Sequence, residues 1–206
     1  MKIRHIIDAA MVVLMPLLMA YALFGEGFHE IAGTALFVLF LAHQIVNRRW
    51  YGALYKGKYT PHRTFRTVLN GLLWVIMIGL IVSAVLISRH LYTPLAQRHL
   101  PWPHKLHMLA AYWGYVLMSV HAGTHMTAML RNRWARAAAV LVFAYGTYAF
   151  IRRDFVDCLF LRAHFAPVEP RGTFIIDYIA VMAACVILGA AAVAWLNKLT
   201  SPRVVG

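Results

Sequence analysis

The stretch HEIAGTALFVLFLAH, residues 29–43, begins and ends with histidine and is almost entirely apolar in between. A second stretch, HMLAAYWGYVLMSVH, residues 107–121, has the same arrangement and the same interval of fourteen residues. In an α-helix, this interval rises about 21 Å and returns to nearly the same face, about 40° away. Each stretch therefore predicts a membrane-length helix that carries one histidine near each end of a single face.

The composition of the chain is that of an integral membrane protein. Of its 206 residues, 62% are hydrophobic and only 13% are charged, and the mean hydropathy is +0.65. A soluble domain has about 45–50% apolar residues. We therefore expect a membrane protein and not a soluble domain with a large core.

Six apolar runs approach the length of about 20 residues that a membrane-spanning helix needs. They predict an all-α, polytopic transmembrane bundle that forms one integral membrane domain over residues 1–206. The first run also resembles a signal peptide, but we interpret it as the first transmembrane helix. The fifth run is short, and a position at the membrane interface is the alternative for it. The expected helices are residues 5–24, 29–47, 66–88, 105–128, 135–151 and 173–197.

The net charge of +13 orients the chain in the bilayer. No basic helix stands apart from the hydrophobic runs, which argues against nucleic acid as a partner and leaves membrane lipid as the expected surroundings. With the N-terminus in the cytoplasm, thirteen of the 20 basic residues fall in cytoplasmic segments and seven in outer ones. The excess of basic residues on the inner side favours both termini being cytoplasmic.

The two histidine-bounded helices are predicted to run parallel, since both enter the membrane from its outer side. His29 then lies beside His107 near the outer surface, and His43 lies beside His121 near the inner surface. Histidine within a membrane span is costly unless it is paired or ligated. Two histidines that face each other across a helix pair can supply both axial ligands of a haem. The pattern predicts a four-helix core with two haem b groups, non-covalent because the chain has no Cys-x-x-Cys-His motif.

His125 lies four residues after His121 and is the alternative inner ligand. This pair would also suit zinc, but no His-Glu-x-x-His pattern is present, and histidines about 21 Å apart cannot share one ion. Gly114 shares a face with His107, and Gly33 follows His29 by one turn. A glycine at either place lets a flat macrocycle or another helix come close.

Haem propionates are anionic and need donors near each surface. Arg49 and Arg66 are candidates on the inner side, and Arg89 and Lys105 on the outer side. Membrane anchoring is the alternative role for such interfacial residues. Near the inner level, Asn47 and Asn70 are candidates for helix capping or for binding a quinone.

Four groups of residues resemble those of a known family. They are His29-Glu30 with Gly33 and His43; Asn47 with Arg49-Trp50-Tyr51 and the run from Lys56 to Pro61; Lys105 to Ala110 with Tyr112-Trp113-Gly114, His121 and His125; and Tyr145 to Phe150 followed by Phe160-Leu161-Arg162, His164 and Phe165. Over nearly its whole length, the chain resembles the small membrane cytochromes associated with extracytosolic flavinylation systems, called flavinylation-associated cytochromes.

This resemblance implies a haem-bearing electron conduit in the bacterial inner (cytoplasmic) membrane. It implies electron transfer between the quinone pool, or another membrane donor, and a flavin-bearing partner outside the cytosol. Quinol oxidation within an oxidoreductase complex would be the corresponding enzymatic role. Two other functions are compatible with the residues: a metal-ion transporter that uses the histidines as stations, and a membrane anchor subunit without haem. A transporter predicts acidic residues deep in the membrane, whereas Asp8 and Asp177 lie near predicted helix ends.

Overall fold

The computed structural model describes residues 2–162 and 172–200, of which 83% are helical. The described part of the chain contains no strand, so the all-α prediction is confirmed. His164 and Phe165 of the family resemblance lie outside the described residues. The helices are α1 (Lys2–Met19), α2 (Tyr21–Phe24), α3 (Glu26–Val46), α4 (Arg49–Ala53), α5 (Pro61–Ile87), α6 (Trp102–Gly123), α7 (Arg133–Arg152), α8 (Phe155–Leu159) and α9 (Gly172–Thr200), with 3-10 turns η1 (Thr93–Leu95) and η2 (Thr127–Leu130).

Six long helices correspond to the six predicted ones. Four of them, α3, α5, α7 and α9, are long and apolar enough to cross a membrane. The prediction of a multi-pass membrane protein is confirmed at this level. The helix expected at 135–151 is α7, which is one of the four, so its length does not require an interfacial position.

Two helix boundaries differ from the prediction. The first predicted helix is interrupted at Ala20, between α1 and α2, and Gly25, with φ of 81°, separates α2 from α3. Helix α5 begins at Pro61 and not at residue 66. Proline suits the first turn of a helix, and the Thr60 side chain accepts a hydrogen bond from the Arg63 amide as an N-terminal cap.

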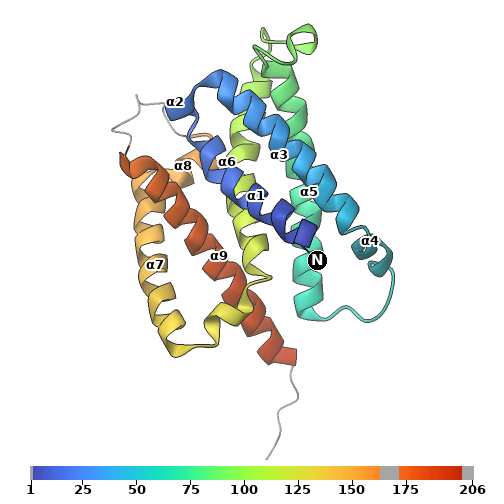
Figure 1. Ribbon diagram of the computed structural model, residues 1–206, viewed down its shortest axis with the longest axis vertical. Coiled ribbons are helices and arrows are strands. Elements are labelled where there is room, and N and C mark those ends of the chain that lie inside the picture. The colour runs from blue at the N-terminus through green and yellow to red at the C-terminus, as the bar shows by residue number, and fades with distance from the viewer. Residues whose placement is uncertain (1, 163–171, 201–206) are drawn as a thin grey trace, which may run out of the picture.

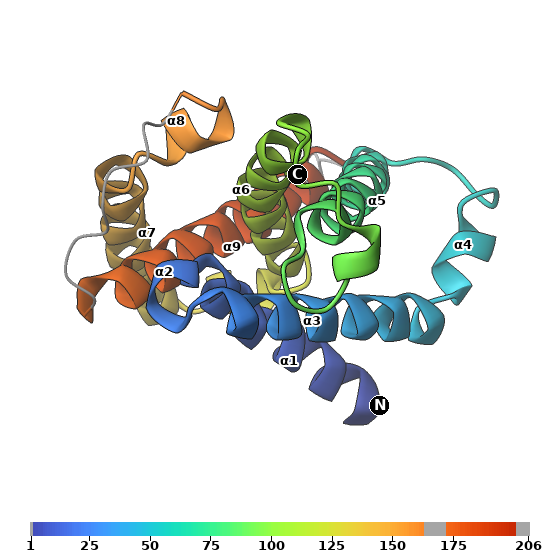
Figure 2. The same cartoon turned by 90° about the horizontal axis from the view of Figure 1, so that it is seen from above.

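Helix α6 lies in the middle of the bundle, packed against α5 and α9, and α7 packs against α9 (Figure 1). Helices α1 and α3 form an antiparallel pair that crosses one side of the bundle obliquely, as the view from above shows (Figure 2). Helices α3 and α6 begin at the same end of the bundle and run in the same direction (Figure 1). The two histidine-bounded helices therefore run in the same general direction, as predicted, but α3 crosses α6 obliquely (Figures 1 and 2).

Two glycines allow the backbones of α6 and α9 to touch. A Cβ atom added at Gly123 would overlap the Val186 carbonyl, and one added at Gly189 would overlap the Val120 carbonyl. Membrane helices rely on such small residues for close packing, because lipid provides no hydrophobic drive for their association. The position of α6 in the bundle consequently depends on these reciprocal contacts.

Asp177 joins α9 to α7. It lies near the beginning of α9, as expected from its position near a predicted helix end. Its carboxylate is fully buried and accepts hydrogen bonds from the Tyr145 hydroxyl and from Arg153 Nε, each at 2.8 Å. This buried charge is therefore paired within the interface between the two helices, as a carboxylate in an apolar bundle requires.

We expect Gly189→Ala to destabilise the protein by about 1–3 kcal/mol, the usual cost of overpacking, because the new methyl group would force α9 away from the α6 backbone. The measurement is thermal unfolding in detergent, followed by circular dichroism. Gly71→Ala in α5 is the control, since a Cβ there meets nothing within 4 Å and alanine favours a helix by about 1 kcal/mol. Equal unfolding temperatures for the two variants would contradict the close packing of α6 on α9.

Candidate functional site

His29 of α3 and His107 of α6 face each other at the end of the bundle where both helices begin. Their ring centroids are 5.9 Å apart, and the ring planes are inclined by 70°. The structure thus brings together the two histidines that the equal spacing pairs at the outer level.

Hydrogen bonds assign the proton positions on both of these rings. His29 Nδ1 lies 3.1 Å from the Leu18 carbonyl oxygen, which can only accept, so Nδ1 carries the hydrogen. The Ser83 hydroxyl donates to the Gly79 carbonyl at 2.6 Å, and its oxygen therefore accepts from His107 Nδ1 at 3.2 Å. Each neutral ring is left with an unprotonated Nε2, which is the form that binds a metal.

At the opposite end of α3, at the level predicted to be the inner one, His43 also carries its proton on Nδ1, but for a different reason. Its Nδ1 lies 2.7 Å from Asp8 Oδ1 on α1, and a carboxylate only accepts. Asn47 donates to the His43 carbonyl at 2.8 Å at the end of α3. Of the two roles expected for Asn47, the structure therefore shows helix capping.

His121 lies on α6 at the inner level, but no ring contact joins it to His43 in the described part of the chain. Its Nδ1 is buried and has no hydrogen-bond partner among the described residues, and the same is true of Asn70 Oδ1 on α5. The antiparallel register of α5 on α6, fixed where Ser83 meets His107, places residue 70 level with residue 120, next to His121. Two unpartnered polar atoms thus lie at the same depth on neighbouring helices.

His125 is not on a helix, because α6 ends at Gly123 and not near residue 128 as predicted. Its ring contacts that of His121, with centroids 5.2 Å apart. Arg66 Nη2 lies 2.8 Å from His125 Nε2 and 3.1 Å from its Nδ1, and a guanidinium can only donate, so Arg66 faces the one acceptor nitrogen of the neutral ring, whichever of the two it is. Burial, together with the positive charge of Arg66, lowers the pKa of His125 to about 4, so its ring is neutral at pH 7.

The two glycines of the predicted site face helices. A Cβ added at Gly114 would lie 3.1 Å from Ile76 Cγ2 on α5, and one added at Gly33 would lie 3.8 Å from Leu18 Cδ2 on α1. Of the two reasons expected for a glycine at these places, the structure supports helix packing, and at Gly114 the space is filled by α5.

The four basic candidates differ in their surroundings. Arg66 is bonded to the ring described above, and Arg89 Nε pairs with Glu26 Oε1 at 3.1 Å. Arg49 and Lys105 are exposed, near opposite ends of the bundle. Of the four, only Arg66 contacts one of the histidines at the inner level, through His125, in the described part of the chain.

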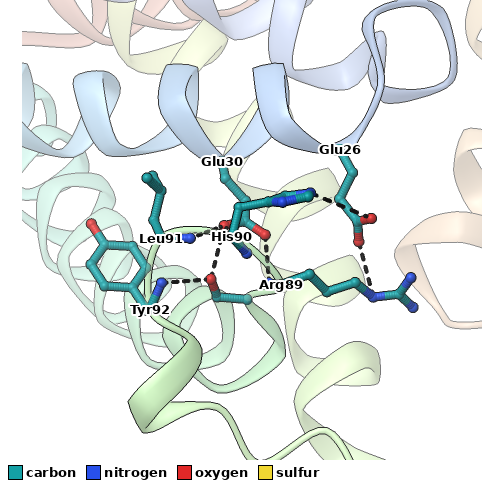
Figure 3. A network of polar contacts seen from close by, with 7 residues as sticks. Glu26, Glu30, Arg89, His90, Leu91 and Tyr92 are labelled. Carbon is teal, nitrogen blue, oxygen red and sulfur yellow. Dashed lines mark hydrogen bonds and ion pairs between the residues drawn. The ribbon is translucent and has the colours of Figure 1, made fainter.

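A carboxylate next to His29 anchors the start of α3, and Figure 3 shows its network. Glu30 accepts hydrogen bonds from one hydroxyl and three backbone amides of the loop that follows α5. The donors are the Ser88 hydroxyl at 2.8 Å and the amides of Arg89 at 2.7 Å, His90 at 3.2 Å and Leu91 at 2.9 Å. Because Glu30 adjoins His29 on α3, this network fixes the outer histidine relative to α5.

The residues that hold the histidines are not identified by the histidine spacing. Asp8 and Glu30 nevertheless give a signal in the sequence, since each is a carboxylate within or beside an apolar run. Ser83 gives a weaker signal, because serine inside a membrane helix commonly bonds its own backbone, as it also does here. The Leu18 carbonyl gives none.

A cavity of about 200 Å³ opens beside the inner level, between α4 and the start of α5. Trp50, His62, Arg63 and Arg66 line it. The His62 Nε2 atom is buried and has no partner in the described residues. The cavity is therefore connected to the inner histidines through Arg66 and His125.

No family model matches the chain, and neither the curated proteins nor the solved structures contain a match. Among the described residues, no group of three or more His, Cys, Asp or Glu side chains is arranged to hold a metal ion.

We expect Glu30→Ala to lower the free energy of unfolding by about 1.5–3 kcal/mol, the contribution of hydrogen bonds to a charged group. Amide hydrogen exchange at residues 89–91 should also become faster, because their acceptor is removed. Glu26→Ala is the control, since its partner Arg89 is 55% exposed and exposed ion pairs contribute about 0–1 kcal/mol. Equal effects of the two variants on stability and on exchange would show that the Glu30 network does not anchor α3.

Proposed function

We propose that the protein is a transmembrane electron-transfer cytochrome of b type, with two haems that are each held between a histidine of α3 and a histidine of α6. The outer pair supports this most directly. Two imidazoles that bind one iron from opposite sides have centroids roughly 6 Å apart, because a metal–nitrogen bond of about 2 Å and the ring radius add on each side. The centroids of His29 and His107 are 5.9 Å apart.

The chemistry of the donor set also fits. Histidines that bind metals almost always donate their other N–H to a carboxylate, a carbonyl or another oxygen, and His29, His43 and His107 all do so. Bound haem would supply one-electron transfer. The chain would supply the axial ligands, their orientation and apolar surroundings.

His121 is the better partner for His43 at the inner level. Arg66 faces the one acceptor nitrogen of the neutral His125 ring, whereas His121 lies on the same helix face as His107 and has no such bond among the described residues. In this arrangement His125 would orient Arg66 toward a propionate. Arg49 on the inner side, and Arg89 and Lys105 on the outer side, are the other donors we propose.

We further propose that α1 and α6 cross the membrane together with the four helices that are long and apolar enough to do so. Helix α6 packs along α5 and α9, and α1 packs along α3, so these neighbours fix their depth. The distribution of basic residues places the N-terminus in the cytoplasm. The family resemblance supports the bacterial inner membrane as the location.

The chain itself would connect the two levels. Phe40, which lies between His29 and His43 on α3, is edge-on against Trp74 of α5, with centroids 5.1 Å apart. The resemblance supports the quinone pool or another membrane donor as one redox partner, and an extracytosolic flavin-bearing protein as the other. The protein would then relay electrons across the membrane.

The test is a redox-titrated visible spectrum of the purified protein with its haem content. We expect a Soret band, a reduced-minus-oxidised α-band and two haems per chain. His107→Ala should remove one haem, because the outer iron would lose an axial ligand, and His121→Ala should remove the other.

Two matched variants sharpen this test. His125→Ala should retain both haems, and so should His99→Ala, which changes an exposed loop histidine. A protein without a Soret band would exclude the cytochrome; metal-ion uptake into vesicles by that protein would favour the transporter. Histidine variants that change only stability would favour the membrane anchor.

A further inference from the structure

The histidines differ in the group that holds the nitrogen facing away from the ligand position. His29 and His107 donate to neutral oxygens, a backbone carbonyl and a serine hydroxyl. His43 instead donates to the carboxylate of Asp8, at the shorter distance of 2.7 Å. The two levels are therefore chemically unequal, although the histidine spacing is the same at both.

Helix α1 produces this inequality. It runs antiparallel to α3 and supplies a partner at each level, the Leu18 carbonyl at the outer one and the Asp8 side chain at the inner one. The Asp8 side chain is 42% exposed and that of His43 is 24% exposed, so the pair does not carry the cost of full burial.

A carboxylate partner changes the imidazole as a ligand. The charge-assisted bond draws the Nδ1 proton toward the carboxylate, which raises the basicity of the ring and its electron donation through Nε2. Stronger donation stabilises the ferric state of a bound iron relative to the ferrous state. A neutral partner has a smaller effect of the same kind.

We propose that Asp8 is a positioning residue that lowers the reduction potential at the inner level through His43. This inference rests on the proposed haem ligation and adds a determinant of the potential to it. Asp8 both fixes the orientation of the His43 ring and makes it the strongest electron donor of the three histidines whose partners are described.

Other charges near the two levels act less directly. Glu26 and Glu30 at the outer level bind Arg89 and the backbone amides of the loop, and neither carboxylate is bonded to a histidine ligand (Figure 3). At the inner level, Arg66 is bonded to His125 and not to His43. Among the described residues, the contact between a carboxylate and a proposed ligand is therefore confined to Asp8 and His43.

The experiment is a redox titration of the α-band in wild type and in Asp8→Asn. The asparagine is isosteric and its carbonyl oxygen still accepts from Nδ1, so it removes the charge and keeps the bond. We expect one of the two reduction steps to move to higher potential and the other to stay in place. Haem affinity at that level should weaken by up to about 10–100-fold, as for other partners of metal ligands. The step that disappears in His43→Ala identifies the inner level.

Three further variants complete the design. Asp8→Glu keeps the charge and should stay close to wild type, and Asp8→Ser, with a neutral hydroxyl as at Ser83, should reproduce the upward shift. Glu26→Gln removes an outer carboxylate that touches no ligand and should leave the inner step unchanged. An unchanged inner step in both Asp8→Asn and Asp8→Ser, or equal shifts of both steps, would overturn the role of Asp8 while leaving the cytochrome in place. A wild-type protein without haem would overturn the proposed function itself.

Discussion

The structure depends on giving a hydrogen-bond partner to the imidazoles that lie inside an apolar bundle. An unpaired polar group in such surroundings costs several kcal/mol, of the order of 2–7 kcal/mol. The neighbouring helix meets this need on one side of each ring: α1 provides Leu18 and Asp8 to α3, and α5 provides Ser83 to α6. The opposite nitrogen is left without a proton on each of these three rings, and this property makes the site suitable for a metal.

The remaining packing holds these helices at fixed depth. Helix α6 is fixed to α9 by the contacts at Gly123 and Gly189, which tolerate no Cβ. Helix α3 is fixed to the loop after α5 by Glu30. A displacement of one helical turn is about 5.4 Å, nearly the whole separation of the outer ring centroids, so small sliding motions would separate the histidine pair.

The sequence predicts the helices well because long apolar runs have few alternatives in a membrane. The interval of fourteen residues places His29 and His43 on one face of α3, and His107 and His121 on one face of α6. Because both helices run in the same direction, this predicts that His29 meets His107. What the sequence does not predict depends on tertiary neighbours. The end of α6 at Gly123, the space filled by α5 beside Gly114, and the bond of Arg66 to His125 all require the packing of two or more helices. Asp8 is visible as an isolated carboxylate, but only the antiparallel pairing of α1 with α3 shows which histidine it meets.

The choice between His121 and His125 illustrates why proton positions matter more than proximity. Both rings lie at the inner level and contact each other. A guanidinium has only donors, so its bond to His125 requires an unprotonated nitrogen on that ring and occupies the same lone pair that an iron would need. His121 has a buried Nδ1 with no partner among the described residues. A proton on this Nδ1 would give His121 the protonation state that His29, His43 and His107 already have.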